Sequence, residues 1–402
     1  MKIGVIGDPH FGSSYHFGHV LDNNLNSRLL DYSNTLKFAI RKAADAGAKI
    51  MMITGDLFKT CRPGTVESEA FWSILEWAFH EYGMVFYIAA GNHDMPTYSR
   101  KTVQQVATNL NGRSYIIACD TITAINLEEE NLSLVLVPFF NKVTEKLETN
   151  QDILDKIESE IENLDLREKT VAVWHGLSEG TYLANYTGME VDALSEPVIP
   201  LSLSKRFNVC VFGHVHRFTE ISRDSNSLVV NIGSMEVNDF TDTGQSKYMI
   251  IVDTDAKGKD IPMDVQYIEL PVVKAETIKM EVNGTIELGL KDKIDEKQVK
   301  GKIVRLQLVA DEDSIATFDD NSIREYMNNL GVYKYMSTTF KTLKEDDGEE
   351  DNYGDELDLS TQGNLTMVLI EEFLKDNNLP LIPQTMSYAK DIVNKITGDM
   401  QL

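Results

Sequence analysis

The sequence predicts an α/β protein in which layers of mixed sheets are flanked by helices and followed by smaller C-terminal parts. Short apolar runs alternate with segments of helical periodicity over residues 1–265. Most of these runs are continuously apolar, as in strands that are covered on both faces. The chain has 402 residues, of which 42% are hydrophobic and 25% charged, so it can bury a large core and form two or three domains.

The expected strands of this first region are apolar runs separated by helical segments. They are Ile3–Ile6, Ile50–Ile53, Val85–Ala89, Leu134–Val137, Val171–Trp174, Val209–Phe212, Leu228–Ile232 and Tyr248–Val252. Helices are expected over residues 28–46, 66–82 and 143–165, where apolar side chains recur at helical spacing. Because strands and helices alternate, we expect a layered domain built on a central pair of sheets.

Residues 266–343 are expected to form a small α+β module, because the apolar pattern changes after residue 265. Its expected elements are strands at Tyr267–Leu270, Lys279–Val282 and Ile303–Val309 and a helix near Asp320–Leu330. The sequence therefore indicates a second, smaller unit behind the layered domain.

The C-terminal part is expected to hold a flexible linker and a pair of helices. Residues 344–360 are the predicted linker, since Glu345 to Asp358 contains nine acidic residues and no basic one. Residues 361–402 carry the apolar stripes of two amphipathic helices, separated by two prolines. A helical pair behind a flexible linker cannot bury both stripes alone, so we expect it to dock on a partner. Folding back onto its own domain is the alternative.

Composition and charge limit the class of protein. No apolar run approaches the roughly 18 residues of a membrane span, and the N-terminus enters a strand without a signal-peptide pattern, so we expect a cytoplasmic protein with no membrane contact. The three cysteines lie far apart and are expected to be reduced thiols. The net charge of −25 argues against a free-standing DNA-binding protein, unless bound dications or a basic partner supply positive charge.

Five short motifs, each directly behind an apolar run, carry the functional prediction. They are Asp8-Pro9-His10, Gly55-Asp56, Gly91-Asn92-His93-Asp94, His175 and Gly213-His214-Val215-His216. Imidazole and carboxylate groups hold borderline divalent metals, and two such metals about 3.5–4 Å apart activate water and clamp a phosphate. The carboxyl ends of strands are where open α/β sheets place their ligands, so we expect the motifs to converge on a dinuclear centre.

The spacing within the motifs fits this centre. Asp8 and His10 are two residues apart in an extended segment, so both side chains leave the same face, and His214 and His216 repeat that geometry. Asp56 can bridge two cations, because its two oxygens can be shared. For any one of these histidines a structural role would be the usual interpretation, whereas the complete set points to metal. The remaining histidines, His16, His19 and His80, are expected to be surface residues, and the Trp72 and Trp77 pair to belong to the core or a dimer interface.

With these motifs the chain resembles the calcineurin-like metallophosphoesterases. Within that superfamily it is similar to the SbcD-type, or meiotic-recombination-eleven, nuclease subunits of DNA repair complexes, especially the compact forms that phages encode. The narrower likeness rests on the GNHD motif, on Asp56-Leu57-Phe58 followed by Arg62-Pro63, on the small module and on the helical tail. It covers nearly the whole chain and is most secure up to about residue 255.

The resemblance implies a role for each motif residue. One metal would be held by Asp8, His10, Asp56 and His216, and the other by Asp56, Asn92, His175 and His214. A bridging water would attack the phosphodiester, His93 would protonate the leaving group, and Asp94 would orient the His93 ring. Manganese is the implied metal, two ions per subunit, although this ligand set would also accept magnesium or another divalent ion.

The implied activity is that of a manganese-dependent DNA nuclease in recombination and repair. It would act as an exonuclease on double-stranded ends and as an endonuclease on single-stranded or hairpin DNA. The implied partners are DNA, bound in part by the module at 266–343, an SMC-like ATPase bound by the C-terminal helices, and a second copy of the nuclease domain. The implied compartment is the cytoplasm of a bacterium or of a phage-infected host.

Two further interpretations keep the same fold. The site could serve a phosphomonoesterase or a cyclic-nucleotide phosphodiesterase, or the fold could be a non-catalytic scaffold. The acidic linker and helical pair disfavour the former, and the complete motif set disfavours the latter. One position departs from some relatives, which have a histidine three residues after the bridging aspartate. This chain has Lys59 there, and Lys59 with nearby Arg62 could contact a DNA phosphate.

Overall fold

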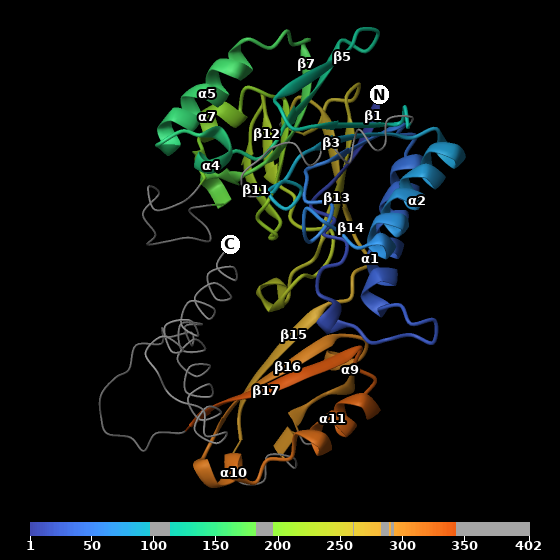
Figure 1. Cartoon of the computed structure of the whole chain (residues 1–402), viewed down its shortest axis with the longest axis vertical. Helices are drawn as coiled ribbons and strands as arrows, with labels where there is room; N and C mark the ends of the chain where they lie inside the picture. Colours follow the sequence, from blue (N-terminus) through green and yellow to red (C-terminus); the bar gives the residue numbers. More distant parts are fainter. Residues whose placement is uncertain (97–112, 182–195, 260, 283–288, 291–292, 343–402) are drawn as a thin grey trace, which may run out of the picture. The chain divides into compact units, whose positions relative to one another are not determined.

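The computed structural model describes residues 1–96, 113–181, 196–259, 261–282, 289–290 and 293–342. Its largest part is a pair of six-stranded mixed sheets (Figure 1). The first sheet has the order β14-β13-β1-β2-β3-β4, formed by Asp264–Glu269, Tyr248–Asp253, Lys2–Ile6, Ile50–Ile53, Val85–Ala89 and Ile116–Cys119. The second has the order β11-β12-β10-β7-β6-β5, formed by Thr219–Arg223, Leu228–Asn231, Val209–Gly213, Lys169–His175, Leu132–Val137 and Thr123–Leu127.

The two sheets are similar in the directions of their strands. In each, four successive strands run parallel, whereas β13 and β14 in the first sheet, and β5 and β11 in the second, pair antiparallel with their neighbours. All eight expected strands are present in these sheets, and β2 and β3 have the predicted bounds. The predicted α/β class with a central sheet pair is confirmed.

The core lies in three layers between sheets and helices. Within β2, Ile50 and Met52 face the second sheet, whereas Met51 and Ile53 face the helices. The helices α1 (Ser27–Asp45) and α2 (Thr65–Tyr82) cover the outer face of the first sheet. The helices α4 (Lys142–Glu145), α5 (Asn150–Glu162) and α7 (Leu201–Ser204) flank the second sheet (Figure 1). Because both faces of each sheet are covered, their central strands are apolar throughout.

The segment expected as one helix over residues 143–165 forms two helices. Lys146 ends α4 in the left-handed region at φ 56°, and Thr149 begins α5 with a capping box to Asp152. The capping box gives side-chain acceptors to N–H groups at the start of α5, which stabilises a new start over continuation. The break is caused by the backbone conformation at Lys146 and the cap at Thr149, which the spacing of apolar residues does not reveal.

A separate three-stranded sheet is parallel and has the order β15-β16-β17, formed by Ala275–Glu281, Ile303–Ala310 and Lys334–Thr342. Three helices accompany it: α9 (Glu296–Val299), α10 (Glu312–Ala316) and α11 (Asp320–Asn329). The strand expected at Tyr267–Leu270 does not belong to this sheet, which corrects the prediction. As β14 it pairs with β13, because Val265 and Tyr267 pack in the core between the two large sheets.

The remaining described elements are short. They are β8 (Leu177–Ser178) paired with β9 (Val198–Ile199), and the 3-10 turns η1 (Tyr15–Phe17) and η3 (Phe240–Asp242). Every helix in the described ranges is too short or too polar to cross a bilayer. The predicted linker at 344–360 and the helices within 361–402 lie outside the described residues, and the domain limits at 265/266, 343/344 and 360/361 stay predictions.

Candidate metal centre

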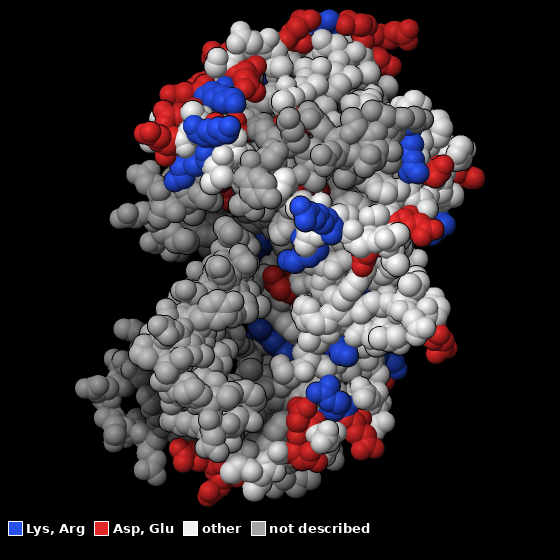
Figure 2. Space-filling model, in the orientation of Figure 1, with Lys and Arg blue, Asp and Glu red and all other residues white. Residues whose placement is uncertain are grey.

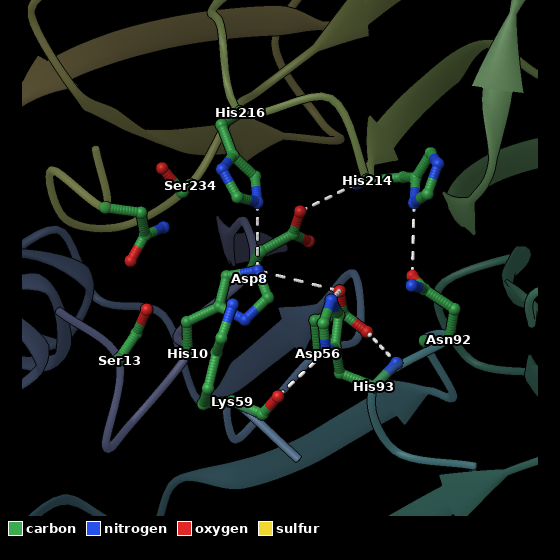
Figure 3. A network of polar contacts seen from close by, with 12 residues as sticks. Asp8, His10, Ser13, Asp56, Lys59, Asn92, His93, His214, His216 and Ser234 are labelled. Carbon is green, nitrogen blue, oxygen red and sulfur yellow. Dashed lines mark hydrogen bonds and ion pairs between the residues drawn. The ribbon is translucent and has the colours of Figure 1, made fainter. Parts of the chain in front are cut away.

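The five motifs meet where the carboxyl ends of parallel strands from both sheets converge. Figure 3 labels residues of four of them, around Asp8, Asp56, Asn92 and His214. Asp8, Asp56 and Asn92 follow β1, β2 and β3 of the first sheet. Three of the histidines come from the second sheet: His175 ends β7, and His214 and His216 follow β10. The centre therefore lies across the seam between the two sheets.

One group of side chains consists of Asp8, His10 and His216, whose ligand atoms all lie within 4.8 Å of one another. The Nε2 atoms of His10 and His216 are 3.0 Å apart. Two imidazole nitrogens at that distance share at most one proton, and the His10 Nδ1 atom is buried without a hydrogen-bond partner among the described residues. Such nitrogens suit a common cation.

A second group lies on the other side of Asp56. The Asn92 Oδ1 atom is 2.9 Å from His175 Nε2 and 3.1 Å from His214 Nδ1. The Asp56 Oδ2 atom is 3.5 Å from His175 Nε2 and 3.6 Å from His10 Nε2. Asp56 thus lies between the two groups, which is the position a bridging ligand requires. Asp8 also lies within ligand distance of Asp56 and His175.

The donor set fits two divalent cations. Asp8, His10, Asp56 and His175 are at most 2% exposed, and the two buried carboxylates lie close together. Burial raises the pKa of Asp56, and the charges of Asp8 and Asp94 raise that pKa further. Buried charges of one sign are costly unless a counter-ion compensates them. Dications held by imidazole, amide and carboxylate groups supply that compensation.

Three of the histidines, His10, His175 and His216, are held in the form that binds metal. Burial lowers the pKa of His10 and of His175, and neighbouring histidines lower both pKa values further. Burial also lowers the pKa of His216, to about 4. Neutral imidazole is the metal-binding form, so these three rings need not lose a proton near neutral pH.

The backbone at the centre is strained. His10, Asp56 and His214 have φ angles of 46°, 49° and 88°, in the left-handed region that non-glycine residues avoid. Such conformations cost on the order of 1–3 kcal/mol each and cluster at functional sites. Gly91 is required for the close packing, because a Cβ atom there would lie 2.1 Å from Asp56 Oδ1. The fold tolerates this backbone strain at the positions where the candidate ligands come together.

His93 lies beside the ligands rather than among them. Its backbone N–H donates to Asp56 Oδ1 at 2.8 Å, and its Nε2 atom is 4.0 Å from Asp56 Oδ2. Its Nδ1 atom is 2.8 Å from the carbonyl oxygen of Lys59 (Figure 3). The side chain is 28% exposed, so a substrate can reach the ring.

The role implied for Asp94 needs correction. Its carboxylate accepts backbone N–H groups of Gly91, Asp56 and Leu57 at 2.8, 2.8 and 2.9 Å. The ring of His93 is oriented by Lys59, through its main-chain carbonyl. Asp94 instead ties the loop after β3 to the loop after β2, because three backbone donors converge on it.

Three polar residues outside the motifs also support the centre. Thr54 Oγ1 donates to Asp8 Oδ1 at 2.8 Å, Glu196 Oε1 is 2.9 Å from His214 Nε2, and Lys247 Nζ donates to the carbonyl oxygen of His216 at 2.9 Å. Thr54 directly precedes a motif, so its position could have suggested it. Glu196 and Lys247 belong to none, and no sequence signal marks them.

The histidines and tryptophans outside the motifs lie where the sequence predicts them. His16, His19 and His80 are exposed. Trp72 and Trp77 are partly buried and pack against the core under α1 and α2. Within the described ranges, the histidines of the proposed centre therefore all belong to the motifs.

Comparison with known proteins gives the class. Residues 1–218 match the calcineurin-like phosphoesterase family, which is more than half of the chain. The chain belongs to the calcineurin-like phosphoesterase family, and with the ligand cluster it is a metal-dependent phosphoesterase. The layered fold that the resemblance implied is confirmed.

Within that class the chain is similar to Mre11-type proteins, as the motifs indicated. The DNA double-strand break repair protein Mre11 of Methanocaldococcus jannaschii is 24% identical over 313 residues, covering 72% of this chain and 73% of the relative. Similar solved structures include a dimetal phosphatase from Danio rerio (TM-score 0.38, 11% identity, 67% of this chain and 99% of that one). Another is the phosphopantetheinyl hydrolase from Mycobacterium tuberculosis (TM-score 0.34, 13% identity, 58% and 90%).

Proposed function

We propose that the protein is a manganese-dependent DNA nuclease of the Mre11 type that acts in recombination and repair. The observation that carries the proposal is the position of Asp56 between two groups of imidazole and carboxylate donors, with His93 beside them. The similarity to a DNA repair protein supports DNA as the substrate. Double-stranded ends and single-stranded or hairpin DNA are the proposed substrates.

The ligand sets follow from the two groups. Asp8, His10, Asp56 and His216 would hold one ion, and Asp56, Asn92, His175 and His214 the other. Dications held by these residues would supply water activation and charge neutralisation of the phosphate. Asp94 and Thr54 hold the loops and carboxylates that present these ligands.

His93 is the proposed general acid, acting through Nε2. The Lys59 carbonyl can only accept, so Nδ1 carries a proton, and the proton given to the leaving oxygen must come from Nε2. Burial lowers the pKa of His93, and the charge of Lys59 lowers that pKa further. A bound phosphodiester is an anion and raises the pKa again. A bound phosphodiester would therefore favour the protonated ring that this role requires.

Charge explains why a partner is expected. On the face shown in Figure 2, Lys and Arg side chains form small groups among Asp and Glu rather than one broad basic surface. Phosphate affinity then depends on the metal centre and on exposed residues such as Lys59 and Arg62. We propose that an SMC-like ATPase, bound by the helices predicted within 361–402, and a second nuclease subunit complete the DNA-binding assembly.

The test is cleavage of end-labelled duplex and hairpin DNA with manganese, with and without the cognate ATPase. Wild-type protein should degrade both substrates, and Asp56→Ala should abolish cleavage, because Asp56 lies between both donor groups. A phosphomonoester and a cyclic nucleotide are assayed in parallel. Rapid hydrolysis of either, together with intact DNA, would refute the proposal in favour of a small-molecule phosphoesterase.

A further inference from the structure

Glu196 contacts the metal centre from outside the five motifs. Its Oε1 atom is 2.9 Å from His214 Nε2, whereas Asn92 contacts the other ring nitrogen, Nδ1. The side chains of Glu196 and His214 are 15% and 19% exposed, so the contact is largely shielded from water. The other carboxylate oxygen of Glu196 is buried and has no hydrogen-bond partner among the described residues.

The segment that carries Glu196 is fixed beside the histidine motif. Strand β9 begins two residues later and pairs with β8, which starts two residues after His175. Leu177 of β8 and Val198 of β9 pack against Val215, the residue between His214 and His216. The carboxylate is thus presented from the residue two positions before a short paired strand.

The contact determines which nitrogen of His214 faces the centre. An ionised carboxylate can only accept, so it places the imidazole proton on Nε2 and leaves the Nδ1 lone pair directed toward Asn92. The backbone N–H of His214 donates to Asp8 Oδ2 at 2.7 Å. His214 is therefore held at its main chain by one carboxylate and at its ring by another.

We propose that Glu196 is a positioning residue of the metal centre. It orients His214 and sets the affinity for the ion whose proposed ligands include His214 and Asn92. This inference rests on the proposed ligand set and adds a residue to it. A carboxylate behind a ligating histidine fixes the tautomer and makes the ring a better donor. Losing such a partner typically weakens metal binding about 10- to 100-fold.

The test is a titration of metal-free protein with manganese. Calorimetry measures the affinity for each ion, and electron spin resonance detects the signal of the coupled ion pair. Glu196→Ala should bind one ion normally and the other about 10- to 100-fold more weakly, with loss of the coupled signal. Glu196→Gln should be intermediate, because its amide oxygen still accepts the hydrogen bond but carries no charge. Glu179→Ala is the matched control, since Glu179 directly follows β8 and accepts the backbone N–H of Leu201, so its loss perturbs the same paired element.

Three results would overturn the inference. Wild-type affinity for both ions in Glu196→Ala would show that the contact has no influence on metal binding. An equal loss in Glu179→Ala would show that the segment matters only for local folding, and thermal unfolding of each variant reports on that directly. Equal weakening of both ions would show that Glu196 acts on the whole centre rather than through His214. Failure of the wild type to bind two ions would instead count against the proposed function.

Discussion

The Nδ1 atom of His93 donates to the main-chain carbonyl oxygen of Lys59, 2.8 Å away. The orientation of the ring therefore depends on the path of the loop after β2 and not on the side chain at position 59. The side chain of Lys59 can therefore be replaced in an experiment without removing the hydrogen bond that orients the His93 ring.

Replacing His93 by Leu should remove the proton donor and leave the seven ligands in place. Cleavage should fall about 10²- to 10⁴-fold, the usual contribution of a positioned general acid, while two manganese ions still bind. Lys59→Ala is the control: it keeps the carbonyl, so it should retain the chemical step at saturating DNA and show only weaker, less salt-dependent DNA binding. Collapse of metal binding in His93→Leu would make His93 a ligand and the assignment wrong.

Replacing Asp94 by Asn should loosen the centre without removing a ligand. One amide oxygen cannot accept all three backbone N–H groups that the carboxylate accepts, so at least one buried donor loses its partner. We expect a loss of about 1–3 kcal/mol in the free energy of unfolding, with weaker manganese binding, measured by urea denaturation and calorimetry. Wild-type stability and affinity in the Asp94→Asn variant would contradict the role of Asp94 as a tie between loops.

Replacing Lys247 by Met should be strongly destabilising. Lys247 is fully buried, and its ammonium group donates to His216 O, Ser234 Oγ and Asp242 Oδ1, the last at 2.5 Å. Removing it leaves the buried Asp242 charge unpaired, which typically costs about 3–5 kcal/mol. A second change, Asp242→Asn, should recover part of the loss, because it removes that charge. If the double variant were less stable than Lys247→Met, the explanation would fail.

Acid should weaken the metal-free protein partly through His216. Burial lowers its pKa from the usual 6.5 to about 4, so the unfolded chain takes up the proton first. The resulting stability is present above pH 6.5 and is lost as the pH falls through 4, up to about 3 kcal/mol. The measurement is the free energy of unfolding of wild type minus that of His216→Gln, from about pH 7.5 to about pH 4. The expectation would be refuted if this difference in the free energy of unfolding stayed constant or grew as the pH is lowered.

The same comparison made with His214→Gln should have the opposite sign. Burial would lower the pKa of His214, but the charge and hydrogen bond of Glu196 outweigh burial and raise it above the usual 6.5. The contribution of His214 is therefore present below pH 6.5 and is lost as the pH rises through the folded pKa. The two variants together serve as internal controls for one another.

Deleting residues 360–402 should separate catalysis from assembly. The proposed ligands all lie within residues 8–216, so manganese-dependent cleavage of simple DNA ends should persist. Co-purification with the ATPase and ATP-stimulated cleavage should be lost, because the helices predicted in this segment are the proposed contact. Leu369→Glu, which places a charge in the first apolar stripe, should reproduce most of the defect. Undiminished complex formation by both variants would place the interface elsewhere.

Sequence reasoning was most reliable where strands are buried on both faces. Strands such as β2 and β3 are continuous apolar runs, so their bounds could be predicted to the residue. The edge strands β5 and β11 and the polar strand β17 mix apolar and polar residues and were not predicted. The proximity of the candidate ligands could be predicted because each stands at or after the end of such a buried run, whereas their role as ligands stays a prediction. Glu196 reaches the centre through the pairing of β8 with β9, a tertiary relationship that spacing along the chain does not encode.

The division of the ligands between two sheets also fixes when the centre can form during synthesis. The first sheet is built from residues 2–119 and 248–269, whereas the second is one uninterrupted stretch, residues 123–231, inserted between those two pieces. A nascent chain that ends before residue 175 presents only aspartates, an asparagine and one ligating histidine, and neither donor group is complete. Ion uptake at the full centre must therefore follow translation of His216. A chain translated only up to that point lacks a complete donor group, so we expect it to have no phosphodiesterase activity.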